Sequence, residues 1–243
     1  MRITRVITGV TDLDEAERVW SHTLGLPAVR HGEALVVAVG DATLTLELRP
    51  DADVADHLAL AIPADAFDAA RRWLTERCDL LARDGQDEFT GPPGWDSRSL
   101  YFAGPSRAVL ELIARERLPD RIGEQPFGPH HLLGISEVGV AVPDVPAAVL
   151  TFAEVAGLTP FAGTESADFA AVGDDHGLLI LAETGRAWLP TRDRRAAAAP
   201  LSVRLVAGSA EDPSGPHRDT GGTTCTARLG AATITVAAGC RPG

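Results

Sequence analysis

The sequence of 243 residues predicts an α+β fold in two similar halves, each built from paired β-α-β-β units. Short apolar strands alternate with amphipathic helices, and turn residues separate the two strands that follow each helix. The second half also repeats landmarks of the first at one offset. Asp12, Gly25 and Leu26 recur 132 positions later as Asp144, Gly157 and Leu158.

The first unit begins with a strand over residues 3–10, where apolar residues alternate with polar ones. Asp12 stands just before a run with helical apolar spacing, which is typical of a helix cap, and Gly25 is predicted to end that helix. Two strands over 34–39 and 43–48 follow, joined by a Gly-Asp turn.

The second unit repeats this order, with a strand over 57–62 and a helix over 65–78. Two strands follow over 99–102 and 108–113, with a Gly-Pro-Ser turn at 104–106. Each unit has room for one additional weak strand.

A Pro- and Gly-rich stretch over 119–131 predicts a linker between a first domain, 1–118, and a second domain, 132–243. The last unit of the second domain is degraded. After a strand over 202–206 a helix is due, but 208–222 contains Pro, Gly and Ser, which predicts a loop.

The composition limits the range of partners. The net charge of −12 argues against nucleic acid and anionic membranes, because both would repel the chain. Cys78, Cys225 and Cys240 match neither a disulfide scaffold nor a zinc knuckle, which favours a reducing cytoplasm. No signal-peptide pattern or apolar run of about 18 residues occurs. We therefore expect a cytoplasmic monomer or homodimer that binds a small molecule.

Two motifs carry a resemblance to a known family. Residues 10–16, Val-Thr-Asp-Leu-Asp-Glu-Ala, followed by Leu-Gly-Leu at 24–26, are similar to the first strand, helix and turn of the vicinal-oxygen-chelate superfamily. Its members include glyoxalases, bleomycin-resistance proteins and extradiol dioxygenases. Residues 104–112 resemble its DPxGNxxEL hairpin, with Gly104 where Asp is usual. The resemblance spans nearly the whole chain and implies two domains, each of paired βαβββ modules forming a curled mixed sheet around a cleft.

The resemblance also implies a divalent metal ion in the cleft, held by side chains from the first and last strands of the modules. Its ligand positions fall on His57, Glu111 and Glu137, and the glyoxalase position at the end of the first module falls on Glu47. The remaining equivalent positions carry poor ligands, namely Arg5, Ser202, Thr235 and about Leu181.

Two arrangements of the site remain open. A crossed site joins Glu137 of the second half with His57 and Glu111 of the first. An uncrossed site uses Glu47 with His57 and Glu111, and places Arg5 beside them. We favour the crossed site because it keeps a cation out of the ligand set. Both arrangements predict one working cleft per chain.

One imidazole and two carboxylates would leave about three open positions on an octahedral ion, where a substrate with two adjacent oxygens could chelate. The resemblance therefore implies a metal-dependent lyase or isomerase with Glu111 and Glu137 at the reaction centre, and Mn, Ni, Co, Zn and Fe are not distinguished. One alternative is a metal-free sequestering protein of the bleomycin-resistance type, which the acidic charge favours. Another is an extradiol-type dioxygenase, against which the lack of a second histidine counts.

Overall fold

The computed structural model describes residues 1–50, 56–163, 165–207 and 224–238, and within them 14 strands join one mixed sheet. Helices are few and pack against the sheet, so the predicted α+β class is confirmed. In the described part of the chain, no helix has the length and apolar character needed to cross a membrane.

The first unit contains the predicted strands and helix, together with the additional weak strand, β2. Its elements are β1 (Arg2–Val10), α1 (Leu13–Glu17), a π-helical turn (Arg18–Thr23), β2 (Ala28–His31), β3 (Ala34–Val39) and β4 (Ala42–Leu48). The Asp12 side chain accepts hydrogen bonds from the backbone N–H groups of Asp14 and Glu15, which begins the helix as predicted. Strand β4 returns parallel to β1.

The second unit follows the same plan with a shorter helix than the sequence predicts. Its elements are β5 (His57–Ile62), a 3-10 turn (Ala64–Ala66), α2 (Phe67–Thr75), β6 (Phe89–Thr90), β7 (Ser97–Ala103), a 3-10 turn (Pro105–Arg107) and β8 (Val109–Arg115). Strand β8 is parallel to β5 and antiparallel to β7. The predicted linker over 119–131 contains no strand and only one 3-10 turn, Pro129–His131.

The second half supplies two further units. Their elements are β9 (Gly134–Val142), α3 (Val145–Ala156), β10 (Phe169–Asp174), β11 (Gly177–Glu183), β12 (Leu201–Ala207), β13 (Thr224–Leu229) and β14 (Ala232–Ala238). Asp144 caps α3 by accepting from the backbone N–H of Ala147, and Gly157 ends the helix at φ +63°. The loop predicted over 208–222 lies outside the described residues.

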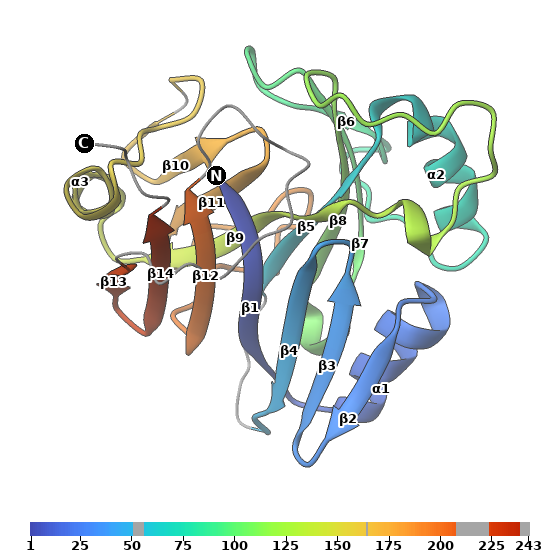
Figure 1. Ribbon diagram of the computed structural model, residues 1–243, viewed down its shortest axis with the longest axis horizontal. Helices are drawn as coiled ribbons and strands as arrows, with labels where there is room; N and C mark the ends of the chain where they lie inside the picture. Colours follow the sequence, from blue (N-terminus) through green and yellow to red (C-terminus); the bar gives the residue numbers. More distant parts are fainter. Residues whose placement is uncertain (51–55, 164, 208–223, 239–243) are drawn as a thin grey trace.

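The four units pair crosswise. Strand β12 of the fourth unit runs antiparallel to β1 of the first, and Figure 1 shows β12 between β14 and β1. Strand β9 of the third unit runs antiparallel to β5 of the second. A single bridge between β1 and β9 joins the two halves of the sheet. The sheet therefore runs through both proposed domains, and their boundaries stay a prediction.

Alternation along β5 separates the core from the site. Leu58, Leu60 and Ile62 belong to the large hydrophobic core, whereas His57 points to the opposite face of the sheet. A second, smaller apolar cluster lies on that face and includes Tyr101, Val109, Ile180 and Trp188. Three of the side chains predicted to bind a metal, His57, Glu111 and Glu137, line a pocket together with residues of this second cluster.

Candidate metal centre

His57 is the first residue of β5 and is 6% exposed. Its Nδ1 lies 3.3 Å from the backbone carbonyl oxygen of Val109 on the neighbouring strand β8. A carbonyl oxygen only accepts, so Nδ1 must donate to it. In the neutral ring this leaves the lone pair on Nε2, which is the arrangement that orients a metal-binding histidine.

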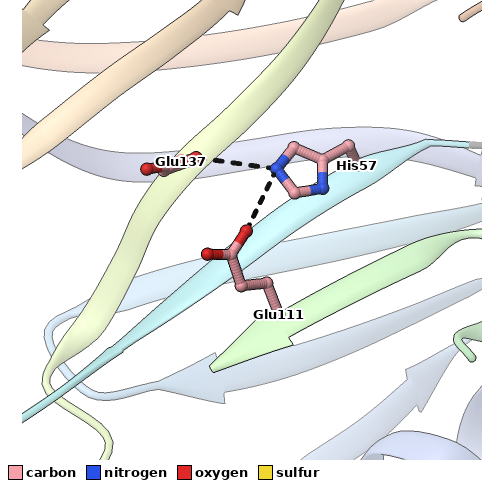
Figure 2. A group of neighbouring side chains, drawn as sticks. All are labelled: His57, Glu111 and Glu137. Atoms are coloured by element: carbon pink, nitrogen blue, oxygen red, sulfur yellow. Dashed lines mark ion pairs between the residues drawn. The ribbon is translucent and has the colours of Figure 1, made fainter. Parts of the chain in front are cut away.

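Two carboxylates approach the same ring nitrogen, one from each neighbour of β5. Glu111 on β8 and Glu137 on β9 both stand opposite Ala59. The His57 Nε2 atom lies 3.5 Å from Oε2 of Glu111 and 3.6 Å from Oε2 of Glu137, and Figure 2 shows both carboxylates directed at this nitrogen. One ligand atom from each residue lies within 4.8 Å of the others, and all three side chains are buried.

Glu47 is not part of this group. It lies on β4 opposite Gly9 of β1, and its Oε2 is 2.6 Å from Nη2 of Arg49. Its side chain is 42% exposed. The reason is that β4 pairs with β1 and β3, and β1 pairs with β12, so Glu47 lies in the other half of the sheet from β5. The structure thus assembles the crossed set of residues, and the metal-binding role of that set stays a prediction.

The remaining equivalent positions lie in the other half of the sheet. Arg5 on β1 stands opposite Arg204 of β12, and Thr235 on β14 also stands opposite Arg204. Ser202 pairs with Ile7. Among the residues that the structure describes, no second group of three His, Cys, Asp or Glu side chains could hold a metal ion.

Strand register also identifies the position in the third unit that is equivalent to Glu111 in the second unit. This would be a fourth ligand position of the site. Glu111 stands opposite Ala59, two residues after His57. The matching position in the third unit stands opposite Gly139, two residues after Glu137, and it is Ile180. The sequence placed it at about Leu181, which belongs to the large core. An apolar side chain there leaves three protein ligands.

Sequence reasoning missed Arg115, the last residue of β8. Its guanidinium is 1% exposed, and it donates from Nη2 to Oε1 of Glu137 and from Nε to Oγ of Ser136 at 3.4 Å. The signal was present, because strand residues separated by an even number share a face, so Arg115 follows Glu111 on the cleft side. The arginine takes one oxygen of Glu137 and leaves Oε2 for the site.

Burial and charge shift the pKa values of the group. Burial lowers the pKa of His57, but the hydrogen bond to Glu137 and the charges of both carboxylates outweigh it and raise that pKa. Burial, with the nearby charge of Glu137, raises the pKa of Glu111 to about 7. Burial and the charge of Glu111 also raise the pKa of Tyr101 well above its usual value.

The group lies in a pocket of about 570 Å³. The walls carry five aromatic side chains, Phe89, Trp95, Tyr101, Phe169 and Trp188. The Trp188 ring stacks on His57 with centroids 5.3 Å apart and 27° between the planes. Pockets of this size and lining are typical of small-molecule sites.

The residues present fit a divalent metal ion. One nitrogen and two carboxylate oxygens converge, and the three residues line an open pocket from which a ligand could reach the ion. Each of the three side chains is oriented by a further contact, His57 by the Val109 carbonyl, Glu137 by Arg115 and Glu111 by Ser99. With both carboxylates ionised, the two glutamates and Arg115 together carry one negative charge, which attracts a cation.

Comparison with solved structures finds likeness over nearly the whole chain. A candidate dioxygenase from Bacillus subtilis subsp. subtilis str. 168 matches with a TM-score of 0.59 and 17% identity, covering 98% of this chain and 85% of that one. Glyoxalase I from Zea mays matches at 0.54 and 15%, covering 98% and 92%. A variant of that enzyme matches at 0.57 and 14%, with the same coverage. No family model matches the chain, and no curated protein matches its sequence.

Proposed function

We propose that this chain, which has the fold of the vicinal-oxygen-chelate superfamily, binds one divalent metal ion through His57, Glu111 and Glu137. The proposed activity is a lyase or isomerase reaction on a small substrate with two adjacent oxygens. The observation that carries the proposal is the convergence of three buried ligand atoms in a pocket large enough for such a substrate. The shared fold alone is compatible with several chemistries.

When bound, the ion would act as a Lewis acid toward the substrate oxygens. The protein's own groups divide the remaining work. Arg115 holds Oε1 of Glu137, so Glu137 serves as a fixed ligand and counter-charge. Within the described residues Glu111 forms no ion pair with an arginine, and it is hydrogen-bonded by Ser99, so it is the carboxylate suited to carry a proton to or from the substrate. Trp188 covers the face of the His57 ring and excludes water from it.

Metal titration by calorimetry tests the proposal. The wild-type chain should bind Mn²⁺ or Ni²⁺ at one ion per chain. Glu137→Gln keeps the shape of the side chain but removes the charge, and it should weaken binding by at least about 10–100-fold, the loss seen when even outer contacts are removed. Glu47→Gln is the matched control and should leave affinity unchanged, because Glu47 lies outside the group. Loss of binding in Glu47→Gln with intact binding in Glu137→Gln would refute the crossed site.

A metal-free binding protein is the second candidate, and a specific observation favours it. Protonated His57 and Arg115 would balance the charges of Glu111 and Glu137, so the buried group can be neutral without an ion. Elemental analysis of protein purified without added metal or chelator separates the two candidates. A metal content near zero, together with no calorimetric binding, supports the sequestering function.

An extradiol-type dioxygenase is the third candidate, and the similarity to the candidate dioxygenase from Bacillus subtilis keeps it open. The ligand set of one histidine and two glutamates differs from the usual pair of histidines with one carboxylate. Oxygen consumption with an aromatic diol and Fe²⁺ under air would support this activity. A product formed equally well without oxygen favours the lyase or isomerase.

A further inference from the structure

The lining of the pocket combines acidic, aromatic and basic side chains. The buried carboxylates of Glu111 and Glu137 lie beside His57, and aromatic side chains form the walls. Two arginines, Arg83 and Arg186, also line the pocket, and unlike the buried group they are exposed or half-exposed. The pocket lining thus combines a buried acidic group, aromatic walls and two arginines that are accessible to solvent.

The walls form a place for flat rings. Trp188 and Tyr101 both face His57, with ring centroids at 5.3 Å and 6.4 Å from that of the imidazole. Phe89 continues the wall from Tyr101, with centroids 5.4 Å apart in an edge-to-face arrangement. Aromatic rings stack favourably on flat ligands, and the volume of about 570 Å³ suits a ligand of more than one ring.

Arg83 and Arg186 come from different units. The backbone of Arg83 and the side chain of Arg186 are fixed by contacts with neighbouring residues. Arg83 precedes β6, and its backbone is held by two hydrogen bonds with Gln86, at 2.8 and 3.0 Å. No ion pair of its guanidinium occurs within the described residues. Arg186 follows β11, where its Nε is 3.1 Å from Asp168 and its guanidinium lies 4.7 Å from the centroid of the Phe169 ring. Both remain able to donate hydrogen bonds to a ligand in the pocket.

We propose that the substrate of this site is a flat aromatic compound with an anionic group at the end opposite its paired oxygens. The inference rests on the proposed function for the position of the paired oxygens. The rings lie between Trp188 and the wall formed by Tyr101 and Phe89. A carboxylate, sulfonate or phosphate lies between Arg83 and Arg186, whose guanidinium groups match planar anions.

Fluorescence titration of the full chain tests the inference, because Trp95 and Trp188 line the pocket and report on its occupation. The probes are 2,3-dihydroxynaphthalene and 2,3-dihydroxynaphthalene-6-sulfonate, which differ in the anionic group. The wild type should bind the sulfonate about tenfold more tightly, the factor expected for two exposed charge pairs of moderate strength. Arg83→Gln should reduce the preference to about threefold, and the double variant with Arg186→Gln should abolish it.

Arg72→Gln is the matched control, since Arg72 is an exposed arginine of the same unit that lies outside the pocket. It should keep the full preference. Equal affinity of the two probes in the wild type overturns the inference, as does an unchanged preference in Arg83→Gln or a failure of both probes to quench. Repeating the titrations with EDTA and with Mn²⁺ separates the two proposals. A sulfonate preference that persists while Mn²⁺ changes nothing supports the inference and refutes the metal-dependent function.

Discussion

The buried ion pair between Arg115 and Glu137 should dominate the stability of the metal-free protein. The two side chains are 1% and 4% exposed, and Arg115→Met removes the cation while keeping an unbranched apolar stem. Removing one partner of a buried pair leaves an uncompensated charge and costs about 3–5 kcal/mol. In a chain of this size each kcal/mol corresponds to about 2–4 °C in Tm, so the expected loss is about 6–20 °C.

Thermal unfolding followed by circular dichroism measures this loss, in EDTA and with saturating Mn²⁺. Arg117→Met is the control, because Arg117 pairs with Asp96 and Asp175 at 40% exposure and an exposed pair contributes at most about 1 kcal/mol. A bound dication would compensate Glu137, so Mn²⁺ should raise the Tm of Arg115→Met more than that of the wild type. If Arg115→Met loses no more than Arg117→Met, the reasoning about the buried pair is wrong.

Three further predictions concern close contacts and reactivity. A Cβ on Gly139 would lie 2.8 Å from the Trp188 ring, so Gly139→Ala should cost about 1–3 kcal/mol and shift the tryptophan emission, and an unchanged spectrum would contradict this packing. Gly40 and Gly32 both have positive φ, but of the two only Gly40 would bring a Cβ against backbone, 2.1 Å from the carbonyl oxygen of Leu133. Gly40→Ala should therefore lower the Tm far more than Gly32→Ala, and similar losses would disprove the contact. Burial raises the pKa of the Cys78 thiol from 9.0 to about 11, which lowers its thiolate fraction at pH 8. Iodoacetamide should therefore modify Cys78 roughly 100-fold more slowly in the folded than in the unfolded chain, as measured by mass spectrometry.

The sequence determined the local structure, and it named His57, Glu111 and Glu137 as candidate ligands together with Glu47. The strands predicted over 34–39 and 57–62 have the same bounds in the structure, and the cap predicted at Asp12 is present. These features depend on residue periodicity and on side chains that bond their own backbone, both of which are visible within a few neighbouring residues. The family motifs placed His57 and Glu111 each on its own strand, because each motif spans only a few neighbouring residues.

The tertiary structure decided how these positions meet. The choice between Glu137 and Glu47 depended on whether β9 or β4 is the strand next to β5. The structure pairs β9 with β5, and this pairing joins residues some 80 positions apart in the chain. The contact of Arg115 with Glu137 likewise needed two strands in register. Periodicity assigns a residue to a face of its own strand, but hydrogen bonding between distant strands selects the neighbour and the register. The candidate site consists of such contacts, which is why the residues could be named from the sequence while their assembly required the fold.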